Sequence, residues 1–184
     1  VDDAHATGTI GSGHGTAAYY GLEKEVDIQL GTLSKSLGSV GGYVAANSTI
    51  IDYLVNMSRS FIFSTALSPA DIGAALSALH VLESDTSVLR QLQNNVNYMA
   101  DCLNSIGIYA TNDTPIFPIR IGSNEDTLAV SNYLYNAGII GTAIRPPTVP
   151  VGESRIRLTV TAAHNKEQID YVCRTLDKAI KELN

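Results

Sequence analysis

The alternation of apolar and polar residues divides the chain into short strands and amphipathic helices. Strands are predicted where apolar residues alternate or cluster between Gly and polar residues, at 26–30, 40–46, 61–63, 116–121, 139–144 and 156–160. Helices are predicted where apolar residues recur at helical spacing, at 50–59, 69–83, 86–106, 125–137 and 165–183. Ser68 followed by Pro69 is typical of a helix start, and Gly107 and Gly138 are typical of helix ends. This order of elements predicts an α/β protein.

The predicted elements fall into two groups, and a chain of 184 residues has room for one large domain or two small ones. Up to about residue 85, strands and helices mix with Gly-rich loops, as in a piece of an α/β sheet domain. From residue 86, a long helix leads into a compact α+β unit. We therefore expect a boundary near residue 85.

Composition narrows the classes of protein further. An apolar fraction of 45% supports a folded core and excludes disorder. The net charge of −6, without a basic run, argues against nucleic acid or an anionic membrane surface as the main partner. No apolar run approaches the roughly 18 residues of a membrane span. Cys102 and Cys173 have no metal-ligand spacing, so we expect two buried, reduced thiols of a cytoplasmic protein.

Lys35 is the first candidate for chemistry. It lies in the segment GTLSKSLG, among small and apolar residues just after a predicted strand. Shelter from water lowers the pKa of a lysine and makes the neutral amine available as a nucleophile or base. Thr32 lies three residues earlier, where its hydroxyl can reach a phosphate. The alternative is a solvated lysine on a turn.

A second candidate is the polar cluster Asp2-Asp3-Ala4-His5, which we expect to follow the end of a strand. A carboxylate there can pair with a protonated ring nitrogen of a cofactor, and the histidine can hydrogen-bond a phenolic oxygen. A polar turn is the alternative. Asp and His are also metal ligands, but no second cluster of ligands follows, so we expect no metal.

Two further segments contain groups that recognise anions. Arg155 and Arg157 lie on the same face of a predicted strand, where an arginine can form two parallel hydrogen bonds with a carboxylate. A rigid proline-rich loop precedes them at 145–150. Ser64 and Thr65 precede a helix start and can bind a phosphate. A solvated strand face and simple helix capping are the alternatives.

Four motifs occur in one order along the chain: DDAHATG, GTLSK, RSFIFSTAL and PPTVPVGESRIRLT. Together they resemble the α-oxoamine synthases, fold-type I enzymes that use pyridoxal 5'-phosphate (PLP), over almost the whole chain. The resemblance implies the C-terminal half of an α/β PLP-dependent transferase. Residues 1–85 would be the C-terminal part of the PLP-binding large domain, with its mixed sheet, and 86–184 a linking helix and an α+β small domain. Ala6 and His14 depart from the usual family pattern without touching the implied roles.

The resemblance implies specific roles for the residues near the cofactor. Lys35 would form a Schiff base with PLP and move protons at the α-carbon of the substrate. Asp2 would pair with the pyridine nitrogen and keep it protonated. His5 would contact the ring hydroxyl, and Thr32 the phosphate.

The resemblance also implies roles at a subunit interface. Ser64 and Thr65 would reach the PLP phosphate of the neighbouring subunit, because family homodimers build the site at the interface. Arg155 is the better match for the arginine that holds the amino-acid carboxylate, and Arg157, on the same strand, is the less favoured match.

Within the family, the segments PPTVP and LTVTAAH favour the members that condense L-alanine with pimeloyl-CoA, or its acyl-carrier-protein equivalent. Loss of CO2 then gives 8-amino-7-oxononanoate, in cytoplasmic biotin biosynthesis. Three alternatives stay open: condensation of glycine with acetyl-CoA, a non-catalytic PLP-fold remnant, and a metal-dependent hydrolase using Asp2, Asp3 and His5.

The chain begins at Val1 rather than at Met and has about half of the family's usual length. We therefore expect that an N-terminal half, which supplies the rest of the sheet and of the site, is a partner of this chain. Alone, the chain is expected to be inactive.

Overall fold

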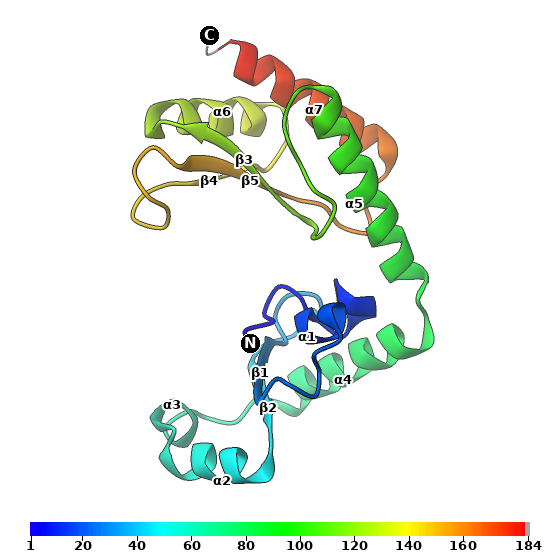
Figure 1. Ribbon diagram of the computed structural model, residues 1–184, viewed down its shortest axis with the longest axis vertical. Helices are drawn as coiled ribbons and strands as arrows, with labels where there is room; N and C mark the ends of the chain where they lie inside the picture. The colour runs from blue at the N-terminus through cyan, green and yellow to red at the C-terminus, as the bar shows by residue number, and fades with distance from the viewer. Residues whose placement is uncertain (183–184) are drawn as a thin grey trace. The chain divides into compact units, whose positions relative to one another are not determined.

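The computed structural model describes residues 1–182 and divides the chain into two compact units (Figure 1). Unit 1 is Val1–Leu89 and unit 2 is Arg90–Asn184. The boundary falls inside a helix, near the expected position at residue 85.

Unit 1 combines a small sheet with short helices. Strands β1 (Ile28–Thr32) and β2 (Gly42–Ala46) pair antiparallel, from Ile28 opposite Ala46 to Thr32 opposite Gly42. The chain start runs parallel to β1, because Asp2 forms a bridge with Leu30. The remaining elements are η1 (Gly11–Gly13), α1 (Thr16–Tyr20), α2 (Ser48–Met57), α3 (Arg59–Ile62) and α4 (Pro69–Ser84).

Unit 1 buries little apolar surface of its own. Its buried apolar residues are Ala6, Ala17, Leu37 and Ala75. Large apolar side chains are instead exposed on both strands and along its helices, among them Leu30, Val44, Tyr53, Met57, Phe61, Phe63, Ile72 and Leu76. Three small alanines and one leucine form only a very small interior, so most of the large apolar side chains of unit 1 lie on its surface.

The predicted strand at 61–63 is wrong. Phe61 and Ile62 belong to α3, and their amides donate to the carbonyl of Ser58. The amide of Phe63 donates to the carbonyl of Arg59 in the same way. A short apolar run does not distinguish a strand from a turn of helix, and here the backbone bonds close locally.

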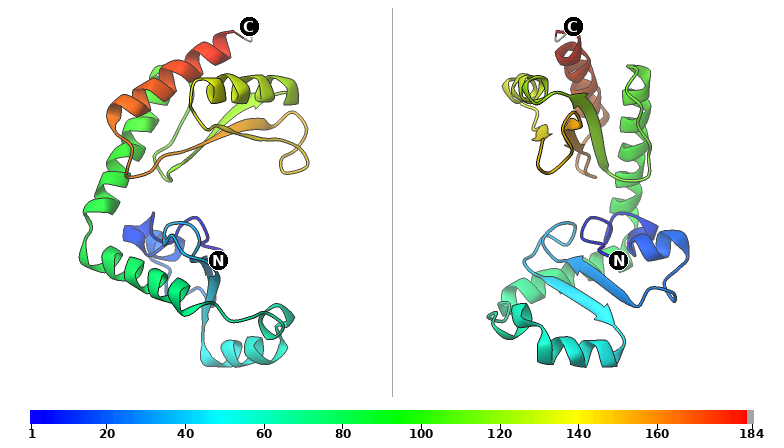
Figure 2. Two further views of the ribbon diagram at one scale, coloured as in Figure 1. Left: turned by 180° about the vertical axis from the view of Figure 1, so that it is seen from behind. Right: turned by 60° about the vertical axis from the view of Figure 1, so that its left-hand side comes forward.

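Unit 2 is a three-stranded antiparallel sheet covered on one face by helices (Figure 2). The strand order is β3–β5–β4, so the last strand lies in the middle. The elements are α5 (Ser87–Ser105), β3 (Ile116–Gly122), α6 (Asn124–Asn136), β4 (Thr142–Ile144), β5 (Ser154–Thr159) and α7 (Lys166–Lys181). The predicted end of the last helix, at residue 183, lies outside the described residues.

Strand β4 is shorter than the predicted strand at 139–144, because the amide of the first predicted residue bonds back to the end of α6. The amide of Ile139 donates to the carbonyl of Leu134, and that of Gly138 donates to Tyr135. These bonds satisfy carbonyls at the end of the helix, so the ladder with β5 begins only at Thr142.

The core of unit 2 joins the inner face of the sheet to the apolar faces of α5, α6 and α7. Its fully enclosed side chains include Met99, Leu103, Phe117, Leu134, Ile156 and Leu176. Cys173 is buried among them, as expected, whereas Cys102 is only half-buried. Burial raises the pKa of the Cys173 thiol to about 12, and burial also raises the pKa of Cys102. Both free thiols are therefore protonated at neutral pH.

Two polar contacts fix α5 to the region of α7. The Tyr98 hydroxyl donates to Asp170 at 2.7 Å, which raises the pKa of Tyr98 to about 12 and lowers that of Asp170. The buried amide of Asn95 donates to the carbonyls of Thr161 and His164, at 2.9 and 2.7 Å. Asn95 therefore satisfies two carbonyls of the loop between β5 and α7.

Within residues 1–182, no helix is both long enough and apolar enough to span a membrane.

Replacing Asn95 with Ala is expected to lower the free energy of unfolding of unit 2 by about 2 kcal/mol, because two part-buried hydrogen bonds of about 1 kcal/mol each are lost. Asn94→Ala is the matched control, since Asn94 is exposed on the same helix and should change stability by less than about 0.5 kcal/mol. Urea denaturation followed by circular dichroism measures both changes. Equal stability of the two variants would contradict this role of Asn95.

Candidate functional site in unit 1 and arginine face of unit 2

The pairing of the chain start with β1 brings two polar loops to one end of the unit 1 sheet. The amide of Leu30 donates to the carbonyl of Val1 at 2.8 Å, and the amide of Asp3 donates to the carbonyl of Leu30 at 2.7 Å. Because the two segments run in the same direction, the loops that follow them leave at the same edge of the sheet. One loop contains His5 and the other contains Lys35.

Direct contacts hold these two loops together. The Ser36 hydroxyl donates to the carbonyl of Thr7 at 2.6 Å. Gly8 adopts a φ of +74°, and a Cβ at this position would lie 2.6 Å from the Ser36 oxygen. Only glycine combines this backbone conformation with such a close approach. The Thr7 hydroxyl also lies 3.0 Å from that of Tyr43 on β2.

Asp2 and His5 are both exposed in this arrangement. The Oδ1 atom of Asp2 accepts a hydrogen bond from the amide of Ala4 at 2.9 Å. Among the residues described, this carboxylate has no ion pair, so it can still accept a proton donor from outside the chain.

Thr32 ends β1, and its hydroxyl joins a small cluster of polar groups. It donates to the carbonyl of Gly41 at 3.0 Å and lies 2.8 Å from the Ser34 hydroxyl. Lys35, three residues after Thr32, is exposed, so the expectation that its amine is sheltered from water is wrong for this chain. Leu37, two residues further along, is buried.

Asp3 has a structural role that the sequence did not reveal. It is 3% exposed, and its Oδ2 accepts a hydrogen bond from the amide of Thr16 at 2.9 Å, at the start of α1. Its Oδ1 has no hydrogen-bond partner within the described part of the chain. Within residues 1–182, no group of three or more His, Cys, Asp or Glu side chains is arranged to hold a metal ion.

Ser64 and Thr65 are not brought to the two loops. Both are exposed directly after α3, which lies toward the opposite end of unit 1 from η1 and α1 (Figures 1 and 2). The Ser64 hydroxyl donates to the carbonyl of Ser60 at 2.5 Å. The structure therefore separates these hydroxyls from Asp2, Thr32 and Lys35.

In unit 2, Arg155 and Arg157 lie on the same face of β5, as predicted, and both are half-buried. Residues between and beside them, Ile156 and Leu158, point into the core. The arginines therefore occupy the sheet face that α5, α6 and α7 leave uncovered (Figure 2).

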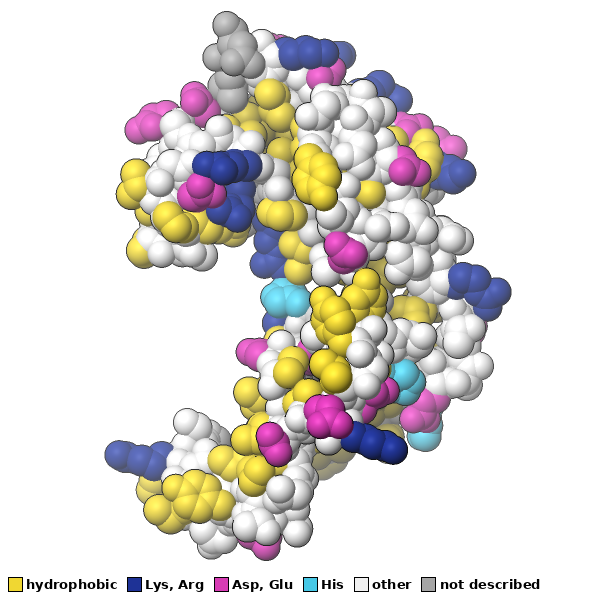
Figure 3. Space-filling view, in the orientation of Figure 1, with side chains coloured by type: hydrophobic (Ala, Val, Ile, Leu, Met, Phe, Trp, Pro, Cys, Tyr) yellow, Lys and Arg dark blue, Asp and Glu magenta, His cyan; other side chains and the backbone are white. Residues whose placement is uncertain are grey.

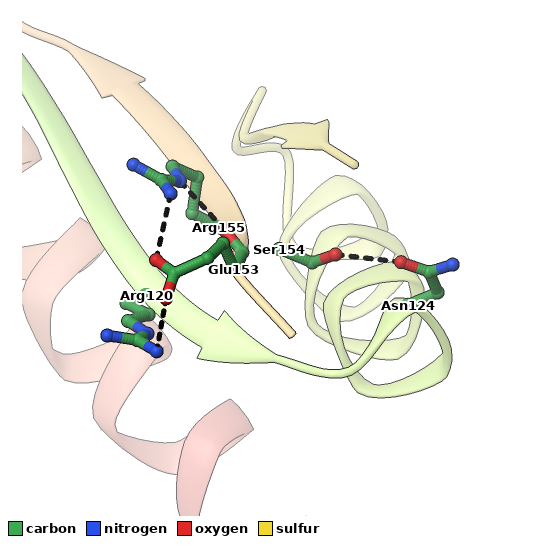
Figure 4. A network of polar contacts seen from close by, with 5 residues as sticks. All are labelled: Arg120, Asn124, Glu153, Ser154 and Arg155. Carbon is green, nitrogen blue, oxygen red and sulfur yellow. Dashed lines mark hydrogen bonds and ion pairs between the residues drawn. The ribbon is translucent and has the colours of Figure 1, made fainter. Parts of the chain in front are cut away.

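The two arginines differ in their contacts. Arg155 is paired with Glu153, with 3.2 Å between Nη2 and Oε2 (Figure 4). The other carboxylate oxygen of Glu153 contacts Arg120 of β3, which lies opposite Arg155 in the ladder. Arg157 has no ion pair or side-chain hydrogen bond among the residues that the structure describes.

Sequence reasoning missed Glu153 and Arg120. The available signal was the spacing of Glu153 and Arg155, two residues apart beside a strand and hence on one face. The contact with Arg120 depends on strand register, which the sequence pattern did not provide.

Comparisons with known proteins agree with the predicted family. The family model for aminotransferase class I and II matches residues 1–176. An 8-amino-7-oxononanoate synthase of Thermoanaerobacter pseudethanolicus is 42% identical over 186 residues, covering 100% of this chain and 47% of the relative. 8-Amino-7-oxononanoate synthase 2 of Bacillus subtilis is also 42% identical, with the same coverage. The chain thus spans about half the length of the curated relatives it matches.

Solved structures have the same fold over their matched halves. A serine palmitoyltransferase from S. paucimobilis with a bound PLP–myriocin aldimine matches with a TM-score of 0.92 and 27% identity, over 100% of this chain and 47% of that one. An 8-amino-7-oxononanoate synthase from Francisella tularensis matches with a TM-score of 0.86 and 25% identity, over 100% and 55%. The mixed α/β units thus match part of the fold of PLP-dependent enzymes, as predicted. The chain belongs to the aminotransferase class I and II family.

Proposed function

We propose that this chain is the C-terminal half of a cytoplasmic PLP-dependent acyltransferase that condenses L-alanine with pimeloyl-CoA. The condensation releases CoA and CO2 and gives 8-amino-7-oxononanoate, in biotin biosynthesis. The observation that carries the proposal is the joining of the His5 and Lys35 loops by the Ser36–Thr7 hydrogen bond. The names of relatives at 42% identity support the choice of reaction.

The chemistry of the unit 1 side chains fits PLP. The cofactor presents an aldehyde, a basic ring nitrogen, a ring hydroxyl and a phosphate. An amine (Lys35), a carboxylate without an ion pair (Asp2), an imidazole (His5) and a hydroxyl (Thr32) complement these groups one by one. When bound, PLP draws electrons away from the α-carbon of an amino acid attached to it.

The residues of unit 1 then have separate tasks. Lys35 would hold the cofactor aldehyde through its amine and would take the proton from the α-carbon of the substrate. Asp2 keeps a proton on the ring nitrogen by accepting its hydrogen bond. Thr32 would turn its hydroxyl proton from the carbonyl of Gly41 to the phosphate, and His5 would contact the ring hydroxyl.

An arginine of unit 2 holds the substrate carboxylate. Family similarity favours Arg155, but Arg155 is already paired with Glu153. Arg157 lies on the same face without such a partner among the described residues, so the contacts favour Arg157 for this role. A guanidinium whose donors are not used by the protein binds a carboxylate without first breaking an ion pair.

Unit 1 has the surface expected of a subunit that is completed by other polypeptide. Exposed apolar side chains gather over α2 and α3, beside Ser64 and Thr65 (Figure 3). Phe61 is 64% exposed and Phe63 is 78% exposed. We assign this surface to a homodimer contact and the uncovered strands of unit 1 to the N-terminal half.

Borohydride reduction tests the cofactor site. The chain is co-expressed with the N-terminal half of the Bacillus subtilis relative, incubated with PLP, reduced and digested for mass spectrometry. The pyridoxyl group is expected on Lys35 and not on Lys24, an equally exposed lysine of unit 1. A co-purifying complex that is labelled equally at Lys24, or not at Lys35, contradicts the proposal. The chain alone is expected to release no CoA from L-alanine and pimeloyl-CoA.

Substitution of each arginine tests the carboxylate site. In the same complex, Arg157→Lys is expected to raise the KM for L-alanine about tenfold or more, because the two parallel hydrogen bonds are lost. Arg155→Lys is expected to change KM less than about threefold. Steady-state kinetics measure both, and the reverse order would restore Arg155 as the binding residue.

Charge on the α3 surface tests the homodimer. Phe63→Lys in the complex is expected to shift its mass in sedimentation equilibrium to that of half the assembly, because a buried lysine opposes the contact. Tyr109→Lys, which replaces an aromatic residue that is 86% exposed on unit 2, should leave the mass unchanged. A dimer that survives Phe63→Lys places the contact elsewhere.

A further inference from the structure

Glu153 directly precedes β5, and hydrogen bonds of this residue and of the next one fix its position. Its amide donates to the carbonyl of Pro150 at 3.1 Å, which closes a turn in which Gly152 has a φ of +81°. The next residue, Ser154, is fully buried, and its hydroxyl donates to Asn124 of α6 at 2.7 Å (Figure 4). The direction of the Glu153 side chain is thus set by the fold.

The carboxylate of Glu153 contacts one arginine with each oxygen. Oε1 lies 2.5 Å from Nη2 of Arg120, and Oε2 lies 3.2 Å from Nη2 of Arg155. The Nε of Arg155 also donates to the backbone carbonyl of Glu153 at 2.9 Å. The side chains of Glu153 and Arg155 are about one-third exposed, whereas that of Arg120 is 66% exposed. Solvent therefore screens the Glu153–Arg155 ion pair less than the Glu153–Arg120 ion pair.

Arg157 differs from Arg155 only in its neighbours. The two residues lie two positions apart on β5, so their Cα atoms are about 7 Å apart on one face. Opposite Arg157 lie Pro118 and Thr142, neither of which is charged. The open face therefore has two arginines, Arg120 and Arg155, paired with the carboxylate of Glu153 and, beside Arg155, one arginine without such a pair.

We propose that Glu153 is a specificity-determining residue, which withholds Arg155 from external anions and leaves Arg157 to bind a single carboxylate. The inference rests on the proposed function, in which this face binds the carboxylate of an amino acid. It adds that the face selects monocarboxylates over dicarboxylates.

The electrostatics give the reason. A second carboxylate that approaches Arg155 meets the negative charge of Glu153 on the same guanidinium, and like charges at this range repel. Removing the charge of Glu153 releases Arg155 as well as Arg120, and Arg155 then lies beside Arg157 at a separation that a short dicarboxylate can bridge. Glu153→Gln removes that charge and keeps the size of the side chain.

The test uses the 184-residue chain with 15N-labelled arginine and two probes, acetate and succinate. The Nε–H signals of Arg155 and Arg157 are assigned with the corresponding lysine variants and followed by NMR during titration. In the unmodified chain, both probes are expected to shift Arg157 and leave Arg155 in place. In Glu153→Gln, succinate is expected to shift Arg155 as well and to bind about tenfold more tightly, the value of one additional charge-assisted hydrogen bond.

Two matched variants serve as controls. Glu125→Gln removes the same charge from α6, which covers the other face of the sheet, and should behave as the unmodified chain. Glu153→Asp keeps the charge and should keep Arg155 unresponsive. The dispersion of the amide spectrum reports whether each variant is folded.

The outcomes separate this inference from the proposed function. A shift of Arg155 in the unmodified chain, or no shift of Arg155 in folded Glu153→Gln, overturns the role of Glu153. An equal gain in affinity for acetate and succinate overturns the selectivity for one carboxylate. If acetate leaves Arg157 unmoved, the carboxylate site of the proposed function is wrong, while the behaviour of Arg155 still decides whether Glu153 withholds it.

Discussion

The parallel pairing of the first residues with β1 is the constraint on which the unit 1 site depends. Two backbone hydrogen bonds, from Leu30 to Val1 and from Asp3 to Leu30, fix the register of the segments that carry the polar loops. Because side chains alternate along a strand, a slip of one residue would turn Asp2 to the opposite face of the sheet. The Ser36–Thr7 hydrogen bond then joins loops whose starting points this register has already matched.

The two units differ in how much apolar surface each buries by itself. Unit 2 encloses side chains as large as Phe117 and Met99 within its own sheet and helices, whereas the largest buried apolar residue of unit 1 is Leu37. At about 25 cal/mol per Å2 of apolar surface, burial of the exposed Tyr, Phe and Leu side chains of unit 1 in the proposed contacts would add stability that unit 1 does not gain by itself. The exposure of Lys35 follows from the same deficit, since an amine at the edge of an uncovered sheet stays hydrated.

The sequence predicted elements where periodicity and end signals agreed. Ser68 before Pro69 identified the start of α4, and the expected face of β5 was confirmed by Arg155 and Arg157. It failed at 61–63, because three apolar residues fit a strand and a helical turn equally well. The Glu153–Arg120 contact was beyond its reach, since that pair depends on the β3–β5 register, a property of two segments far apart in the chain.

The position of Glu153 on the open face of unit 2 distinguishes Arg155 from Arg157 by their contacts, which the family motifs alone do not. The motif supplies two arginines on one strand, and the family resemblance favours Arg155, whereas the contacts in the structure favour Arg157. The turn at Gly152 and the buried Ser154 direct Glu153 toward Arg155. The backbone geometry thus gives two chemically identical arginines different partners. Because unit 2 has its own core, this distinction is built into it without the residues of unit 1. In the proposed function, the selection of a carboxylate and the activation of an α-carbon would therefore belong to different units of the chain, and a substitution at Glu153 would alter the first without touching a residue proposed for the second.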